Sequence, residues 1–164
     1  MHTAYLIFGS NIDPERNLYC AWTELNQLQR ILNSSSIWES PPIGSKGPNF
    51  LNAVIHLESD CDYEGLKWKI LRPLETKMGR IRTADKFAPR QIDLDILIFD
   101  GILLELNMWQ LAYMASPCSE LLPDLNHPET GLTLSVIAEK IAKEQHTILR
   151  YSSFSSLKDF LKVT

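Results

Sequence analysis

The chain has few of the residues that build disulfide-rich, membrane or metal–thiolate proteins. Its three cysteines, Cys20, Cys61 and Cys118, are far apart and odd in number, so they form neither a disulfide framework nor a CxxC metal pair. No run approaches the roughly 18 apolar residues of a membrane span. The first residues show no basic segment followed by a long apolar stretch, which argues against a signal peptide. We therefore expect a soluble, cytoplasmic protein.

Common catalytic motifs are also missing. There is no GxxxxGKS/T sequence, which excludes a P-loop enzyme, and no GxSxG motif of serine hydrolases. No HExxH or cysteine–histidine cluster supports zinc, because His2, His56, His127 and His146 are scattered without a partner at ligand spacing. The formal charge of −4 argues against a nucleic-acid binder.

The bulk composition is that of an ordinary globular domain. The chain has 164 residues, of which 45% are hydrophobic and 22% charged, so it can bury a core and is not a disordered segment. No repeat, linker or low-complexity tract divides it. We expect one domain over residues 1–164, acting as a monomer.

The chain opens with a strand and a helix. Ala4 to Phe8 is an apolar run that ends in the turn Gly9-Ser10-Asn11. Asp13 and Pro14 then suit the cap and the first turn of a helix. Its apolar positions recur at helical spacing: Leu18, Ala21, Leu25, Leu28 and Ile31.

A hairpin and a second helix follow. Ile37-Trp38 and Phe50 to Leu57 predict two strands joined by a long loop, Pro41 to Asn49, which holds three prolines and two glycines. Tyr63 to Met78 predicts a helix, which Pro73 must kink or split because proline removes a backbone donor.

The clearest strand is Gln91 to Phe99, and Asp100-Gly101 after it predicts a hairpin turn. The remainder holds a proline-rich stretch, Pro117 to Pro128, and helices near Leu132 to Lys143 and Phe154 to Leu161. The order β-α-β-β-α-β with C-terminal additions predicts an α+β, ferredoxin-like sandwich. In that fold an antiparallel sheet carries helices on one face.

The strongest candidates for a metal-binding site are Asp93 and Asp95, which lie in this last strand. Side chains alternate along a strand, so these two carboxylates share one face, roughly 7 Å apart. Like charges this close raise the free energy unless a partner is present. A divalent cation removes the penalty, and hard oxygen ligands favour Mg²⁺ with phosphate oxygens completing its octahedron. The alternative is a solvated strand face that carries two acids by chance.

A basic loop precedes that strand. It carries Lys77, Arg80, Arg82, Lys86 and Arg90. Guanidinium groups suit bidentate phosphate contact. Cations beside a metal-binding carboxylate pair provide the charge neutralisation that phosphoryl transfer needs. Together, loop and strand indicate a Mg²⁺–phosphate site, although a merely solvated basic loop is the simpler alternative for the loop alone.

The chain resembles the 6-hydroxymethyl-7,8-dihydropterin pyrophosphokinases of folate biosynthesis. The resemblance rests on a signature of the form GRxR…PRxxDxD over Gly79 to Asp95. Further similar blocks are Tyr5 to Asn11, Ser40 to Gly44, Phe50 to Ala53 and Pro117 to Pro128. The resemblance implies transfer of pyrophosphate from ATP to the hydroxymethyl oxygen of the pterin, with release of AMP and with two Mg²⁺ ions.

The resemblance also implies a role for each matching residue. Asp93 and Asp95 would hold both ions, while Arg80 and Arg90 would stabilise the transferred group. The implied nucleotide contacts are Arg82, Arg90 and Ile96. The implied pterin contacts are Ser40, Pro41, Ile43, Phe50, Asn52 and Tyr113, with Phe50 and Tyr113 stacking on the ring.

One segment departs from the family. Gly101 to Tyr113 is shorter than usual and contains no proline, histidine or arginine, and Leu111 stands where a nucleotide-covering arginine is expected. Two alternatives to an active pyrophosphokinase therefore stay open. One is a divergent relative that binds pterin or nucleotide with little transfer. The other is a different Mg²⁺-dependent enzyme on the same fold, such as a nucleotidyl transferase.

Overall fold

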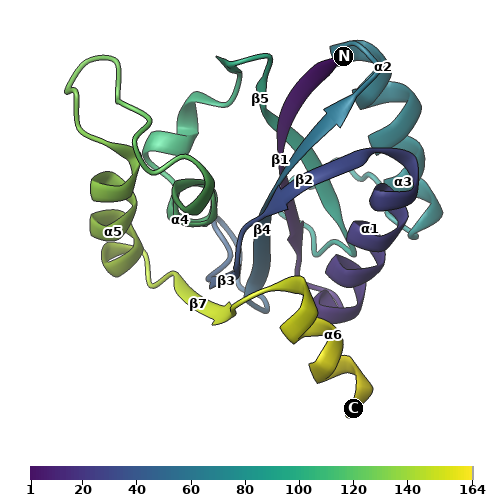
Figure 1. Cartoon of the computed structure of the whole chain (residues 1–164). Coiled ribbons are helices and arrows are strands. Elements are labelled where there is room, and N and C mark those ends of the chain that lie inside the picture. Colours follow the sequence, from purple (N-terminus) through teal and green to yellow (C-terminus); the bar gives the residue numbers. More distant parts are fainter. Residues whose placement is uncertain (164) are drawn as a thin grey trace.

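Strand β1 (His2–Ser10) is the central strand of the sheet because it pairs along both edges. In the computed structural model, which describes residues 1–163, its antiparallel partners are β4 (Phe50–Ser59) and β5 (Asp93–Phe99) (Figure 1). The apolar run expected at Ala4 to Phe8 is thus a strand, and Phe8 is fully buried.

The sheet has seven strands in the order β6-β5-β1-β4-β3-β7, with β2 also paired to β4. The remaining strands are β2 (Arg30–Ser34), β3 (Ile37–Ser40), β6 (Ile102–Leu103) and β7 (Ile148–Tyr151). Strands β3 and β4 form the expected hairpin, and β5 and β6 are joined by the expected turn. The turn residues Asp100 and Gly101 both have positive φ angles, 47° and 79°, as a type I′ turn requires.

The helices of the βαββαβ core cover the first face of the sheet. They are α1 (Pro14–Leu28) and a continuous run of α2 (Tyr63–Gly65), a π-helical turn (Leu66–Leu71) and α3 (Arg72–Lys77). The C-terminal helix α6 (Phe154–Lys162) packs on the same core. This arrangement confirms the predicted α+β, ferredoxin-like sandwich (Figure 1).

Proline splits the second helix, as expected. The π-helical turn ends directly before α3, in which Pro73 occupies the first turn. Proline offers no N–H to the carbonyl four residues earlier and its ring clashes there, so the backbone widens before it. Arg72 begins α3 at this point and faces β5, as described below.

The helices between β6 and β7 cover the second face of the sheet, so the complete molecule has helices on both faces (Figure 1). They comprise a 3₁₀ turn (Leu106–Trp109), α4 (Ala112–Leu121) and α5 (Leu134–Glu144). Helix α4 lies where the sequence predicted only a lid segment and a proline-rich stretch. It contains Pro117, and burial of Met114 and Cys118 against the sheet outweighs the lost hydrogen bond.

The first helix ends earlier than its apolar spacing predicted. It stops at Leu28, and Ile31 instead lies in β2, where it pairs with Leu57 of β4. The predicted helix end was wrong because a further helical turn and an edge strand would both pack the Ile31 side chain against the same core. No helix in residues 1–163 is both long and apolar enough to cross a membrane.

Two leucines of α1 test which side of the helix carries the core. Leu25 is 0% exposed and Leu28 is 51% exposed. Leu25→Ala should lower the free energy of unfolding by about 2–5 kcal/mol, because it leaves a cavity. Leu28→Ala should change it by less than about 0.5 kcal/mol. Urea denaturation measures both, and equal costs would show that the helix packs by a different face.

Candidate functional site

A cavity of about 300 Å³ opens on the second face of the sheet, beyond the first turn of α4. It is bounded by strand residues, two loops and the start of α4. The lining residues are Ile7, Gly9, Ser40, Pro41, Ile43, Ser45, Phe50, Asn52, Lys86, Phe87, Arg90, Asp93, Asp95, Ile96, Leu97, Glu105, Leu111, Tyr113 and Met114. Most of the predicted site residues therefore meet at one place.

Strand alternation directs both acidic side chains into this cavity. Gly9 pairs with Asp93 and Ile7 with Asp95, and all four line the cavity from adjacent strands. Leu94, between the two aspartates, is fully buried in the core on the opposite face. The predicted geometry of the acidic pair is thus present.

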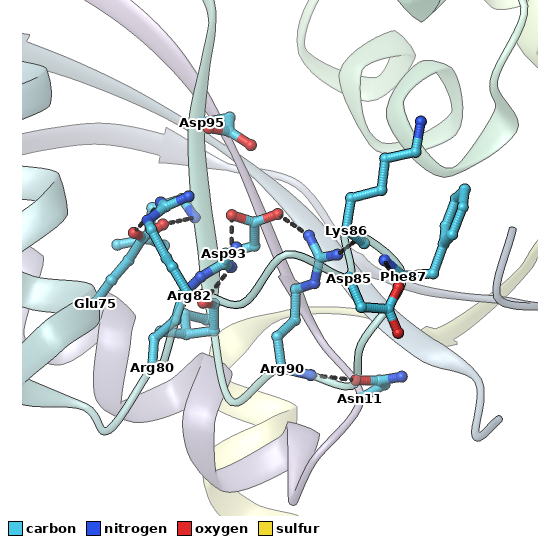
Figure 2. A network of polar contacts seen from close by, with 12 residues as sticks. Asn11, Glu75, Arg80, Arg82, Asp85, Lys86, Phe87, Arg90, Asp93 and Asp95 are labelled. Carbon is cyan, nitrogen blue, oxygen red and sulfur yellow. Dashed lines mark hydrogen bonds and ion pairs between the residues drawn. The ribbon is translucent and has the colours of Figure 1, made fainter. Parts of the chain in front are cut away.

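Asp93 lies between two arginines of the preceding loop (Figure 2). Its carboxylate is 2.7 Å from Arg80 Nη1 and 2.5 Å from Arg90 Nη1. Arg80 also donates to the carbonyl of Ile92 at 3.0 Å, and only 11% of its side chain is exposed. Arg80 therefore supports Asp93 from behind the cavity, whereas Arg90 faces into it.

Arg90 is itself held by the first turn of the chain. The backbone N–H of Arg90 donates to Asn11 Oδ1 at 2.8 Å, and the N–H of Asn11 donates to the Arg90 carbonyl at 3.2 Å. One guanidinium nitrogen of Arg90 donates to the carbonyl of Lys86. The turn after β1 thus fixes the loop that presents the cations.

The outer edge of β5 is covered by side chains instead of a strand. Strand β6 pairs only with Ile98 and Phe99, so Leu94 has no strand partner on that side. Glu75 of α3 accepts the N–H of Leu94 at 2.8 Å, and Arg72 donates to the carbonyl of Leu94 at 2.8 Å. Buried backbone groups need such partners, and these two side chains provide them.

Glu75 is the most deeply buried charged group of the site. It is 1% exposed and accepts hydrogen bonds from Arg72 at 2.8 Å and from Arg82 at 2.7 Å. Burial raises the pKa of Glu75, while the Leu94 N–H and the two arginines oppose that shift. Arg72 also reaches around the strand edge and donates to Asp95 Oδ1 at 2.9 Å.

Aromatic and amide side chains form the other end of the cavity. Asn52 is 2% exposed and donates to Ser40 Oγ at 2.8 Å. Gly9 lies beneath it, and a Cβ at that position would come within 3.2 Å of Asn52 Oδ1. The Arg90 guanidinium lies over the ring of Phe50, and its Cζ atom is 5.9 Å from the ring centre. Burial, with smaller effects of Glu105 and the two aspartates, raises the pKa of Tyr113 to about 12, so its phenol stays neutral.

The structure separates the predicted arginines. Arg90 lines the cavity, but Arg80 and Arg82 do not, and Arg82 bonds Glu75 with 56% of its side chain exposed. Sequence reasoning missed Arg72, which contacts Asp95, and gave Glu75 no role beyond its charge. The only signal was their spacing of three residues on a helix, which allows an ion pair but does not show what else it touches.

The donor atoms of the cavity fit a magnesium ion. Asp93 and Asp95 supply hard oxygen ligands, and Mg²⁺ is typically held by one or two carboxylates together with substrate phosphates. Among residues 1–163, no group of three or more histidine, cysteine, aspartate or glutamate side chains is arranged to hold a metal. Asp93 and Asp95 line the cavity from one strand and are the residues that would hold the ion.

Comparison with known proteins decides the family. The family model described as 7,8-dihydro-6-hydroxymethylpterin-pyrophosphokinase matches residues 5–123. The chain belongs to this pyrophosphokinase family. It is 34% identical to the folic acid synthesis protein of Schizosaccharomyces pombe over 94% of the chain, which is 22% of that protein. It is 31% identical to the Pseudomonas aeruginosa 2-amino-4-hydroxy-6-hydroxymethyldihydropteridine pyrophosphokinase over 76% of the chain and 83% of that enzyme.

Several matches are much longer proteins. The chain spans about a fifth of the S. pombe, Dictyostelium discoideum and Pneumocystis carinii folic acid synthesis proteins (22%, 21% and 20%). Solved HPPK-DHPS structures share the pyrophosphokinase fold. One in complex with substrates has a TM-score of 0.66 at 13% identity and covers 91% of this chain and 46% of its own. At that identity the likeness concerns the fold alone.

Glu75→Gln tests the covered edge of β5. An amide has one acceptor oxygen instead of two, so it cannot serve Leu94 and both arginines. The free energy of unfolding should fall by about 1–3 kcal/mol. Glu58→Gln is the control, because its partner Arg30 is 73% exposed and such pairs contribute less than about 1 kcal/mol. Equal losses in guanidinium chloride denaturation would contradict the role given to Glu75.

Proposed function

We propose that this chain transfers a pyrophosphoryl group from ATP to 6-hydroxymethyl-7,8-dihydropterin in a Mg²⁺-dependent reaction. The hydroxymethyl oxygen attacks the β-phosphorus, the bond between that phosphorus and the α–β bridging oxygen breaks, and AMP leaves. The proposal applies to residues 1–164 as one pyrophosphokinase domain. Family membership and the Pseudomonas relative named for this activity support it.

One observation carries the proposal: a single cavity joins a polar, aromatic-lined end to a carboxylate and guanidinium end. Asn52 on β4 lies at the first and Asp93 on β5 at the second, with Gly9 of β1 between them, and Phe50 and Arg90 are in contact where the two ends meet. A flat heterocycle needs stacking surfaces and a few directed hydrogen bonds. A polyphosphate needs cations and metal-binding oxygens. The transferred group would move between the two ends.

At the pterin end, the residues match the chemistry of the ring. Asn52 both donates and accepts hydrogen bonds, which suits the amide-like edge of a pterin. Phe50 and Tyr113 line the cavity and offer ring faces for stacking, while Ser40, Pro41 and Ile43 close it from the neighbouring loop. The neutral Tyr113 phenol adds no charge to this end.

At the phosphate end, Arg90 neutralises charge on the transferred group, and Ile96 forms part of the wall for the nucleotide. Arg80 keeps Asp93 in place, and Arg82, which is more than half exposed, would have to leave its contact with Glu75 to reach a phosphate. Magnesium bound to Asp93 and Asp95 would supply charge neutralisation and a template for the phosphates.

Formation of AMP tests the activity directly. The protein mixed with ATP, Mg²⁺ and 6-hydroxymethyl-7,8-dihydropterin should release AMP only when the pterin is present. Asp95→Ala should lower the rate by roughly 10³-fold or more, because it removes a metal-binding oxygen. Asp159→Ala, at an exposed position of α6, should leave the rate unchanged. Wild-type activity in Asp95→Ala would exclude the proposed metal site.

Asn52→Leu tests the pterin end separately. Leucine has a similar size but leaves polar groups of the ring unpaired, so pterin affinity should fall roughly 5- to 150-fold. Calorimetric titration in the presence of a non-hydrolysable ATP analogue measures it, and the affinity for the analogue itself should not change. Asn26→Leu, at an exposed position of α1, is the matched control. If Asn52→Leu instead lowers the affinity for the ATP analogue, Asn52 contacts the nucleotide and the pterin must bind in another part of the cavity.

A further inference from the structure

Arg72 makes contacts that its position outside the cavity does not suggest. Its guanidinium donates to Glu75 Oε1 at 2.8 Å, to the Leu94 carbonyl at 2.8 Å and to Asp95 Oδ1 at 2.9 Å. The first two acceptors belong to the covered edge of β5. The third is the carboxylate that faces the cavity. One side chain therefore links the fold to the proposed metal-binding group.

These contacts fix Arg72 in place. Only 19% of its side chain is exposed, and two of its acceptors are a buried carboxylate and a backbone carbonyl of the central sheet. Asp95, by contrast, is 51% exposed. A planar guanidinium with several donors holds such an arrangement at little further entropic cost. Arg72 is thus a permanent counter-ion of Asp95 and not a mobile surface partner.

The charges around the cavity leave no anionic excess for a free cation. Asp93 is paired with Arg80 and Arg90, and Asp95 with Arg72. With Glu75 and Arg82 included, four guanidinium groups face three carboxylates, an excess of one positive charge. Lys86 and Glu105 also line the cavity and offset each other. A divalent ion arriving alone therefore meets a site of its own sign.

We infer that Arg72 is a positioning residue for Asp95. It weakens binding of a free divalent cation at Asp95 and leaves this carboxylate available to a cation that arrives bound to polyphosphate. The negative phosphates would offset the excess positive charge, and Asp95, still held by Arg72, would be available to the ion. Without nucleotide, Arg72 suppresses binding of a divalent cation at Asp95. This inference rests on the proposed function for the identity of the polyphosphate, but not for the suppression of free cation binding.

Binding of Mn²⁺ alone, followed by electron paramagnetic resonance of the free ion, tests the inference without any turnover. The wild-type protein should bind Mn²⁺ with a dissociation constant of about 10⁻³ M or larger. A non-hydrolysable ATP analogue should strengthen that binding. Arg72→Gln should bind Mn²⁺ alone roughly 10-fold more tightly, because a unit charge beside the carboxylate is gone. The gain should disappear in Arg72→Gln combined with Asp95→Asn.

Controls separate the local contact from general effects. Arg30→Gln removes an exposed arginine from an ion pair on β2 and should bind Mn²⁺ like the wild type. Arg72→Gln with Glu75→Gln removes both partners of the buried pair, so it leaves no unpaired buried charge and keeps the same net charge as the wild type. It should still show the gain, and it serves if the single variant does not fold.

Two results would overturn the inference. One is tight Mn²⁺ binding by the wild-type protein alone, which needs no variant to observe. The other is a folded Arg72 variant whose affinity for Mn²⁺ is equal to or weaker than that of the wild type. Absence of AMP formation with the pterin would refute the proposed function while leaving these binding results interpretable, so the two failures are distinguishable.

Discussion

The hydrogen bond between the Glu75 carboxylate and the Leu94 N–H is the contact on which the site depends. Strand β5 lies near the edge of the sheet, and over its first residues no other strand satisfies its outer backbone groups. A buried carboxylate on α3 takes that place. Because Leu94 lies between Asp93 and Asp95, the same bond sets the height and orientation of both cavity-facing carboxylates. Burial raises the pKa of Glu75, and its contacts with Leu94, Arg72 and Arg82 oppose that shift. The carboxylate that covers the strand edge therefore also holds two arginines beside the site.

The site lies where two separate cores meet across one sheet. On the first face, α1 and α3 pack against Leu94 and Leu6, and this core determines where the arginines of α3 and its following loop begin. On the second face, α4 packs against Ile7 and Leu97 and determines where Tyr113 stands. The arginine contacts reach around the free edge of β5 from one side to the other. A mutation in the first core therefore changes the positions of the charged side chains. A mutation in the second core changes the shape of the wall that contains Tyr113.

Local patterns predicted the parts of the site that depend on neighbours in sequence. Alternation along one strand placed Asp93 and Asp95 together, and the prolines and glycines marked the loops that close the cavity. The sequence could not show α4, since Pro117 disfavours a helix that only burial against the sheet stabilises. Nor could it assign Ile31 to β2, because one apolar residue fits a helix face and a strand face equally well. Arg72 was missed for a related reason: its importance arises from Leu94 and Asp95, twenty-two and twenty-three residues away.

The distribution of charge around the cavity bears on residues 101–113, the segment that the sequence led us to expect to differ from the family. Residues 101–113 contribute Glu105, Leu111 and Tyr113 to the wall, and the last two are placed by α4 and the second core instead of by a free loop. The opposite wall carries Arg90, with Lys86 close by. The two loops beside it touch where Gly44, at a φ of 73°, approaches the ring of Phe87 so closely that a Cβ would lie 2.6 Å from it. A polyphosphate in this cavity is therefore met by cations from one side only. The other side presents Leu111, Tyr113 and the Glu105 carboxylate, so the attraction of a polyphosphate to this cavity rests on Arg90 and Lys86.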